Sequence, residues 1–560
     1  MKRPIYLLLA VCMTCLVPAA AFAADPPAAA IDKIFASWDT PDAPGAALAV
    51  VRDGKIVYSR GYGMANLEYG VANAPSTIFH AASLSKQFTA LCIHILAQEG
   101  KLSLDDPLRK YVPEMNVEGS PITIRHLLYH TSGLRDQWDL LTLAGLRLDD
   151  GITDNDIMGL LAQQKQLNFQ PGEDDLYSNS GYFLLGLVVR RVSGQSLAAF
   201  AQERIFGPLD MKHTHFHESY GALVKGRAYS YQRNRDGSYR YVALSYSNTG
   251  ATSLFTTVED LARWNGNFDE PRAGGQAAVA ALLVSGKWNN GREIGYASGV
   301  GVQPYRGVPA VAHSGGDAGY RSYFMRLPQQ KLAVIVLANA SDVIAGDVAS
   351  RVADLYLEGM PGVQPQKTWP REVELQDRDL APYAGDYEVR PGSVLSFVVD
   401  KGKLYSQSGG GSRLALFASA GDEFFSKGPD ITLTFPATIG NEPARTALWK
   451  QGSREYPLKR IVRETPSAAA LQACVGDYYS EELRTLYTLE MRQGKLVVRY
   501  PRGVLELRPI NADVFQAGYP IGTITMKRDA KGNCEGFGVT TGRVRNLRFA
   551  RVKIGPVNGS

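Results

Sequence analysis

An internal repeat near the end of this 560-residue chain restricts its fold more than any other feature. The motif Tyr-Ala-Gly-Asp-Tyr at 383–387 corresponds to Cys-Val-Gly-Asp-Tyr at 474–478, Gly-Lys-Leu at 402–404 to the same triplet at 494–496, and Phe424 to Phe515. The period is about 90 residues, and each copy alternates short apolar runs with turns. We therefore expect two small up-and-down antiparallel β-barrels, over residues 372–465 and 466–560. Two unrelated β domains are the less favoured alternative, given three matches in the same order.

The residues before the repeat have a different pattern. Residues 46–58 alternate apolar and polar side chains around the turn Asp53-Gly54, which predicts a β-hairpin. Tyr320–Leu327 and residues 331–339 predict a second hairpin, and residues 344–357 a helix. The sequence between the hairpins is mostly helical and loop-like. A sheet built from both ends of one unit, with helices inserted, predicts an α/β domain over residues 24–365.

The N-terminus has the pattern of an export signal. Lys2 and Arg3 precede a short apolar stretch, and Ala21-Phe22-Ala23 is a small-x-small cleavage site. We expect residues 1–23 to be removed and the protein to be periplasmic or secreted in a bacterial source. No later segment is apolar enough to span a bilayer, so we expect no membrane anchor.

Charge and cysteine content restrict the partners further. The net charge of +5 falls to +3 when the signal is removed, which is too low for a nucleic-acid-binding surface.

Three of the five cysteines remain after cleavage of the signal. Cys92 lies on an apolar helix face and fits a core position. Cys474 and Cys534 fall in the second repeat and either pair or stay free, because spacing alone does not decide a disulfide.

The first chemical motif is Ser83-Leu84-Ser85-Lys86. Apolar residues repeat at helical spacing from Leu84 to Leu96, so Ser83 falls in the first turn of a buried helix with Lys86 on the same face. Free N–H groups at a helix start can stabilise an oxyanion, and a lysine in a partly dry site can stay neutral and act as a base. The alternative is a helix-capping serine beside a surface lysine.

Two further motifs follow along the chain. Tyr177-Ser178-Asn179 lies between the turn Pro171-Gly172 and an apolar helical run at 182–192; a tyrosine near a cation can relay protons, and Asn179 can hold an amide. His313-Ser314-Gly315-Gly316 precedes the strand Tyr320–Leu327, and its glycines permit close approach of a ligand. Taken singly, a loop tyrosine and an ordinary glycine turn are the simpler interpretations.

Together, these motifs resemble those of the serine hydrolases of the penicillin-binding-protein and class C β-lactamase group. The stretch Ile-Arg-His-Leu-Leu-Tyr-His-Thr-Ser-Gly-Leu at 124–134 is also similar to that family, and the resemblance covers about residues 31–360. It implies a β-lactamase-like domain, an antiparallel sheet flanked by helices with a helical region. It implies Ser83 as the nucleophile that forms an acyl-enzyme, with Lys86 and Tyr177 sharing general-base and general-acid duty. The implied roles of the other residues are an oxyanion hole from the N–H groups of Ser83 and Gly316, orientation of substrate and protons by His313, and substrate binding by Asn179, Gly315 and Gly316.

One such domain followed by two barrels resembles the D-aminopeptidases and the hydrolases of linearised microcystin. The resemblance implies an exported serine peptidase that cleaves peptides or amides, tolerates D- or non-standard residues and needs no cofactor. Alternatives are a carboxylesterase, a weak β-lactamase or DD-peptidase, or a non-catalytic binding or regulatory protein; homo-oligomerisation stays open. In D-aminopeptidases a loop of the last barrel limits the active site, and residues 527–535 are the candidate here. His313 in place of the usual lysine predicts weak attraction for carboxylated substrates.

Two groups of histidines have a spacing that metal ligands can have. His126 and His130 are four apart, and His213, His215 and His217 alternate. No carboxylate or third ligand lies near the first pair in the sequence, and both groups fall where the family resemblance implies structural sequence, so we expect no metal site.

Overall fold

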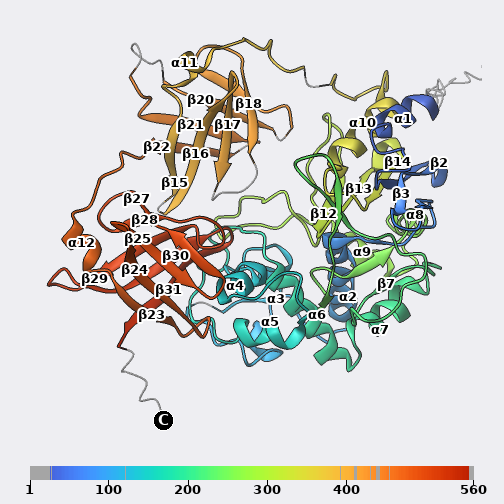
Figure 1. The fold of residues 1–560 in the computed structure, drawn as a ribbon. Helices are drawn as coiled ribbons and strands as arrows, with labels where there is room; N and C mark the ends of the chain where they lie inside the picture. The colour runs from blue at the N-terminus through green and yellow to red at the C-terminus, as the bar shows by residue number, and fades with distance from the viewer. Residues whose placement is uncertain are drawn as a thin grey trace, which may run out of the picture.

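The computed structural model describes residues 26, 28–119, 121–366, 368–390, 392–408, 413–428, 430–436, 442–452 and 454–553. The predicted signal peptide, residues 1–23, lies outside these residues. Figure 1 shows an N-terminal α/β unit, in blue to yellow, followed by two β units in orange and red.

The sheet of the first unit joins the two ends of its sequence. Its antiparallel strands are β1 (Ala46–Arg52), β2 (Lys55–Tyr62), β12 (Val311–Asp317), β13 (Tyr320–Leu327) and β14 (Leu332–Ala338), in the order β12-β13-β14-β1-β2. Both predicted hairpins are confirmed, because β1 pairs with β2 and β13 with β14. β1 and β14 are buried along their whole length, as apolar runs in a central strand require.

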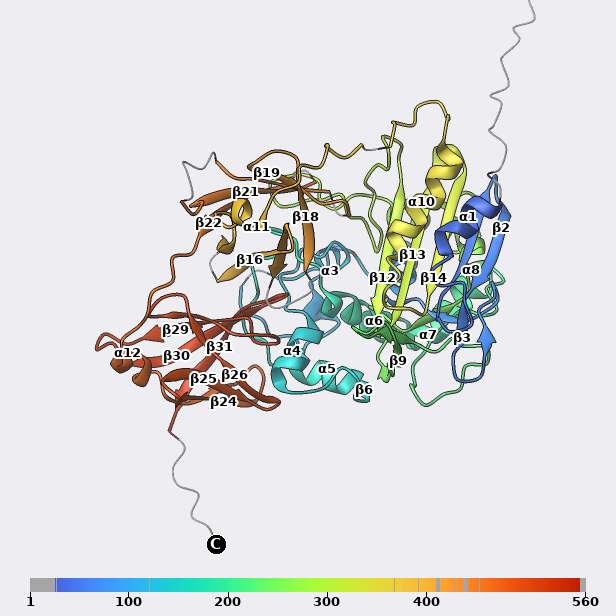
Figure 2. The same ribbon diagram turned by 45° about the horizontal axis from the view of Figure 1, so that its top comes forward.

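Helices cover both faces of this sheet. Figure 2 shows α1 (Ala28–Phe35) and α10 (Ala345–Leu357) side by side over one face, and α10 confirms the helix expected at 344–357. α8 (Val258–Asn267) packs on β14 and β1. The sheet therefore separates two apolar cores.

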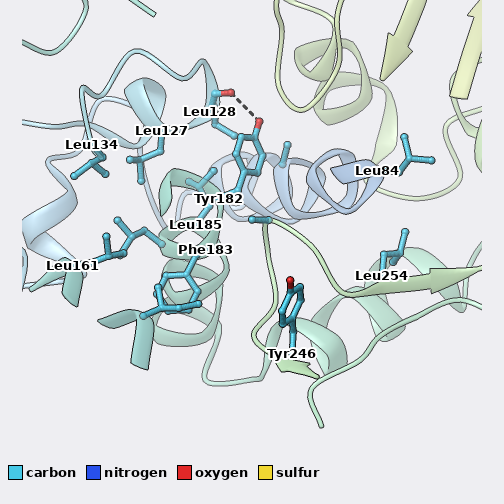
Figure 3. Packing of buried hydrophobic residues seen from close by; sticks show 14 of the residues in the cluster. Leu84, Leu127, Leu128, Leu134, Leu161, Tyr182, Phe183, Leu185, Tyr246 and Leu254 are labelled. Carbon is cyan, nitrogen blue, oxygen red and sulfur yellow. Dashed lines mark hydrogen bonds between the residues drawn. The ribbon is translucent and has the colours of Figure 1, made fainter. Parts of the chain in front are cut away.

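A helical region fills the space between the hairpins. It contains α2 (Ser85–Gln98), α3 (Ile124–Leu128), α4 (Gln137–Ala144), α5 (Asp154–Leu161) and α6 (Asn179–Ser193). Every residue of α2 from Ser85 to Leu96 is buried, so this helix lies inside the domain rather than on it. Figure 3 shows the surrounding leucines and Tyr182, whose hydroxyl donates to the Leu128 carbonyl oxygen at 2.8 Å. Shorter elements complete the unit: α7 (Leu197–Ala201), α9 (Gly275–Leu282), β3 (Met64–Asn66), β4 (Val71–Ala72), β5 (Phe79–His80), β6 (Ile152–Thr153), β7 (His215–Phe216), β8 (Tyr231–Arg233), β9 (Tyr239–Tyr241), β10 (Tyr246–Ser247) and β11 (Leu254–Thr256).

Within the described ranges, no single helix is long and apolar enough to cross a membrane. Only α6 taken together with the segment Leu197–Phe206 meets the length and composition test, and that pair is bent by 79°.

Two antiparallel barrels follow, as predicted. The first is a closed barrel of β15 (Gly385–Arg390), β16 (Ser393–Asp400), β17 (Lys403–Ser408), β18 (Leu414–Ala418), β19 (Glu423–Phe425), β20 (Ile431–Thr434), β21 (Thr446–Gln451) and β22 (Arg454–Arg460). The second is a nine-stranded, nearly closed sheet of β23 (Gly476–Ser480), β24 (Thr485–Arg492), β25 (Lys495–Tyr500), β26 (Gly503–Glu506), β27 (Arg508–Pro509), β28 (Val514–Gln516), β29 (Thr523–Arg528), β30 (Cys534–Thr541) and β31 (Val544–Val552). Short helices precede each one: α11 (Asp377–Leu380) and α12 (Ala468–Gln472).

The two barrels are attached differently. The core of the second barrel is continuous with that of the helical region, whereas the first barrel has an apolar cluster of its own. Arg135, which follows α3, forms a buried ion pair with Glu482 of the second barrel at 2.5 Å. Figure 1 shows this barrel against α4. The pairing left open by the sequence is made, since Cys474 and Cys534 form a disulfide with their Cα atoms 5.2 Å apart.

Candidate active site

Ser83 lies in a short, tightly held turn. The 3-10 helix η1 (Ala82–Leu84) runs directly into α2, and Ala82 has a φ of +48°, which is rare for a residue with a side chain. The hydroxyl of Ser85 donates to the Ala82 carbonyl oxygen at 2.6 Å and accepts from the Leu254 N–H at 3.0 Å. The turn thus presents Ser83 with its N–H at a helix start, where no partner within the helix is available.

Lys86 lies beneath the serine and is fully buried. Its Nζ lies 3.1 Å from Ser83 Oγ, 2.9 Å from Asn179 Oδ1 and 2.8 Å from the Ala251 carbonyl oxygen. A neutral amine fits these neighbours, because it donates to the two carbonyl-type oxygens and keeps a lone pair for the serine hydroxyl. Burial lowers the pKa of Lys86 to about 7, although the charge of Asp136 opposes this shift.

Tyr177 completes the group around the nucleophile. Its ring centroid lies 4.8 Å from Lys86 Nζ, and its hydroxyl is hydrogen-bonded to the Ser83 side chain. Burial raises the Tyr177 pKa well above its usual value, so the hydroxyl keeps its proton. His130 packs on the ring at 4.2 Å, and its Nδ1 accepts from the Ser178 N–H at 3.1 Å. His130 therefore holds the tyrosine segment, a role that its spacing from His126 did not suggest.

Asn179 makes contacts that differ from those we expected. Its Oδ1 accepts from Lys86, while its Nδ2 and backbone N–H donate to Asp136 Oδ2 at 2.9 and 2.7 Å. The side chain thus links the lysine to a buried carboxylate. Substrate binding by Asn179 stays a prediction, whereas positioning of Lys86 follows directly from these contacts. Asp136 was not recognised from the sequence.

The third motif lies on β12, next to the serine turn. His313 Nδ1 donates to the Ser314 carbonyl oxygen at 2.7 Å, so Nε2 is free to accept from the Tyr296 hydroxyl at 3.0 Å. Burial lowers the pKa of His313 to about 3, and the charge of Lys86 adds to the shift. The imidazole is therefore neutral at any working pH. Tyr296 is a further residue that sequence reasoning missed.

The two glycines of this motif have different surroundings. A Cβ atom on Gly315 would lie 2.2 Å from Ser322 Oγ and 2.5 Å from the Ala81 carbonyl oxygen. Gly315 therefore permits the close approach of β12 to the serine turn rather than contact with a ligand. A Cβ atom on Gly316 would meet only the Arg321 side chain, at 3.7 Å or more, and Gly316 lines the cavity. The oxyanion hole expected from the N–H groups of Ser83 and Gly316 stays a prediction.

A cavity of about 720 Å³ opens over these residues. Its volume is that of a site for a small peptide or a molecule of similar size. Ser83, Tyr177, His313 and Gly316 line it together with the aromatic rings of Tyr129, Tyr296, Tyr305 and Tyr323.

A turn of the second barrel reaches this cavity, but it is not the one that we predicted. Residues 527–535 form the turn between β29 and β30; none of them lines the cavity, and Lys527 pairs with Glu535 at the surface. The next turn, between β30 and β31, brings Arg543 into the cavity wall. Several turns of this barrel are hydrophilic and contain glycine, and only the docking of the barrel decides which one faces the site.

Both barrels also contact the segment that leads to the tyrosine motif. Asp174 accepts from Arg390 of the first barrel and from Arg545 of the second, each at 3.3 Å. Asp175 accepts from Arg454 of the first barrel at 2.8 Å. The barrels thus help to fix one wall of the cavity.

The histidines whose spacing is possible for metal ligands make other contacts. His126 Nδ1 accepts from the Thr123 N–H at 3.2 Å and caps α3. His215 and His217 face each other at 3.3 Å between ring nitrogens. Among the residues that the structure describes, no group of three or more His, Cys, Asp or Glu side chains could hold a metal ion.

Comparison with known proteins agrees with this geometry. The family model described as Beta-lactamase matches residues 31–356. A penicillin-binding protein of Bacillus subtilis (strain 168) is 28% identical over 431 residues, which cover 72% of this chain and 93% of the relative. A D-aminopeptidase of Gluconobacter oxydans (strain 621H) is 28% identical over 332 residues, 59% of this chain and 62% of the relative. The solved structure of an octameric penicillin-binding protein homologue from Pyrococcus abyssi has a TM-score of 0.54 and 26% identity, covering 77% of this chain and 98% of that one.

Proposed function

This chain belongs to the beta-lactamase family of serine hydrolases, and we propose that it is a peptidase or amidase that forms an acyl-enzyme on Ser83. The observation that carries the proposal is the buried contact of 3.1 Å between Lys86 Nζ and Ser83 Oγ, with a lysine pKa of about 7. The similarity to a D-aminopeptidase supports substrates that contain D- or non-standard residues.

In the acylation step, Ser83 Oγ attacks the carbonyl carbon of the substrate while its proton moves to Lys86 Nζ. The carbonyl oxygen becomes an oxyanion, which the N–H groups of Ser83 and Gly316 stabilise. The intermediate collapses when the leaving nitrogen takes the hydroxyl proton of Tyr177. The Lys86 ammonium then returns a proton to the phenolate, so the site is neutral again.

Deacylation repeats these moves with water as the nucleophile. Lys86 Nζ removes a proton from the water, which attacks the ester carbonyl, and the Lys86 ammonium returns this proton to Ser83 Oγ as the oxygen leaves. His313 stays neutral throughout and keeps its bond with Tyr296, so it holds the strand edge in place beside the reacting carbonyl.

We also propose that the protein is exported. The charged, apolar and small-residue segments of residues 1–23 support this proposal, and so does the Cys474–Cys534 disulfide, because disulfides persist in oxidising compartments. Trimming of the N-terminus after Ala23, read by mass spectrometry of protein recovered from the periplasm or medium, is the expected result. Recovery of the full-length chain from the cytoplasm alone would contradict it.

The catalytic proposal is tested by labelling with a fluorophosphonate and by turnover of D- and L-aminoacyl 4-nitroanilides and 4-nitrophenyl esters. We expect labelling of Ser83 in the native enzyme and none after heat denaturation. Ser83→Ala should lose activity by several orders of magnitude while its thermal midpoint is retained. Residual activity of about a tenth would disprove the assignment. Cleavage of esters without anilides would make the protein a carboxylesterase instead.

A further inference from the structure

We propose that Arg543 of the second barrel binds a carboxylate of the substrate beside the scissile bond and so determines substrate specificity. This inference rests on the proposed function of the Ser83 site and narrows its substrates to peptides or amides that carry an acidic group. Arg543 lies in the turn between β30 and β31 and lines the same cavity as Ser83 and Gly316.

The other titratable groups in and beneath the cavity either have hydrogen-bond partners within the protein or are neutral. Lys86 is fully buried and bonded to three oxygens, and His313 is neutral. The carboxylate of Asp175 accepts from Arg454 at 2.8 and 3.0 Å and from Trp288 at 3.1 Å, so it is poorly placed to bind a free substrate ammonium. The cavity therefore favours an anion over a cation.

The guanidinium of Arg543 has unused donors. Its Nη1 lies 3.4 Å from Asp136 Oδ2, an oxygen that already accepts two shorter bonds from Asn179. Within the described part of the chain, no acceptor lies within hydrogen-bond distance of its Nε or Nη2. The Arg543 side chain is 41% exposed, whereas Asp136 is 1% exposed. A guanidinium with two free donors is suited to bidentate binding of a carboxylate.

The backbone of Arg543 is held rigidly in this position. Its N–H donates to Asp139 Oδ2 at 2.6 Å, and its carbonyl oxygen accepts from Asn168 Nδ2 at 2.9 Å. Arg545, two residues further along the chain, donates from its N–H to Asn168 Oδ1 at 2.7 Å. The turn is therefore preorganised, and little of the binding free energy is lost in ordering it.

The position is also close to the reacting atoms. The Cζ atom of Arg543 lies 5.0 Å from the centroid of the Tyr177 ring, and the Tyr177 hydroxyl is hydrogen-bonded to the Ser83 side chain. A carboxylate bound there lies near the carbonyl that the serine attacks. His313 stands at the position where the family resemblance implies a lysine, so the cation of that lysine is missing. Arg543 supplies a cation from the second barrel instead. The weak attraction for carboxylated substrates expected from His313 stays a prediction, and the proposed role of Arg543 opposes it.

The test compares matched substrates in the full-length enzyme. One pair is D-glutamyl and D-glutaminyl 4-nitroanilide, which differ by a carboxylate on the acyl side; the other is D-alanyl 3-carboxy-4-nitroanilide and D-alanyl 4-nitroanilide, which differ on the leaving group. The readout is the ratio of kcat/KM for the charged and the neutral member. Arg543→Gln should lower this ratio about 10- to 100-fold in at least one pair, with Arg543→Lys intermediate. Arg499→Gln, on the surface of the same barrel and outside the cavity lining, should leave the ratio within about twofold.

The ratio of kcat/KM values distinguishes carboxylate binding by Arg543 from a role in which Arg543 only positions other residues of the site. Loss of the Arg543 charge also lets the pKa of Lys86 rise, but this slows both members of a pair equally. Ratios unchanged by Arg543→Gln in both pairs would overturn the inference while the proposed function stands on the neutral substrates. If no anilide is cleaved, the same comparison is made with the rates of Ser83 labelling by a carboxyalkyl and an alkyl fluorophosphonate. Absence of any labelling would instead reject the proposed function.

Discussion

The pH dependence of acylation tests the environment of Lys86 most directly. An exposed lysine with the ordinary pKa of 10.5 is neutral in about one molecule per thousand at pH 7.5, whereas a pKa of about 7 makes about three-quarters of the molecules neutral. Only the neutral amine has a lone pair for the Ser83 proton. The rate should therefore fall tenfold per pH unit below pH 7 and be about 100-fold lower at pH 5 than at pH 8.

Other groups titrate nearby, and the sign of their effect separates them. Burial raises the pKa values of Asp139 and Asp317 to about 6, so both lose protons in the same range. Ionised Asp317 raises the pKa of Lys86, which opposes the loss of its proton. Deprotonation of this carboxyl group therefore reduces the neutral amine and cannot produce a rate that rises with pH. His313, with its pKa of about 3, is already neutral throughout.

The assay is the second-order rate constant for fluorophosphonate labelling of Ser83 between pH 5 and 9, which does not depend on the choice of substrate. Lys86→Arg keeps a cation that cannot give up its proton, and should react at least about 1,000-fold more slowly with no inflection near pH 7. A rate that still rises tenfold per pH unit at pH 9 in the unmodified enzyme, or equal rates at pH 5 and pH 8, would contradict a Lys86 base that is neutral near pH 7.

Three further substitutions test the site and the second barrel. Gly315→Ala places a Cβ atom 2.5 Å from the Ala81 carbonyl oxygen, so labelling of the nucleophile should fall at least about 100-fold, and a wild-type rate would refute the packing argument. Tyr296→Phe removes the donor to His313 and should lower kcat/KM about tenfold at an unchanged thermal midpoint; full activity would show that the hydroxyl has no positioning role. Cys474→Ser should lower the free energy of unfolding by about 2–4 kcal/mol in denaturant titrations, and reduction of the unmodified protein should do the same, whereas equal midpoints with and without reductant would contradict the disulfide.

The parts of the site that local spacing determines could be predicted. Ser83 and Lys86 are three positions apart, so a helix places them together, and the structure brings them to 3.1 Å. Tyr177 and His313 were identified through the order of their motifs and the resemblance that this order supports. Asp136 could not be found in this way, because its contact with Arg543 joins residues 407 positions apart and depends on how a barrel docks.

The same distinction holds for the fold. Hairpins, the helix after them and the barrel repeat follow from patterns within a few residues, and the structure confirms them. The unequal attachment of the barrels was not predictable, because strands of both copies show the same alternation of apolar and polar side chains. Contacts such as Arg135 with Glu482 join distant segments and leave no local pattern in either one.

The place of Arg543 in the chain has a consequence for when the enzyme becomes active. Ser83 and Lys86 precede Arg543 by at least 457 residues, so they are synthesised long before the turn that completes the cavity wall.

 A chain that is still being synthesised or exported therefore holds its nucleophile and base well before it holds the cavity wall that Arg543 completes. On the proposed role of Arg543, discrimination between substrates begins only after the second barrel has folded and docked on the helical region.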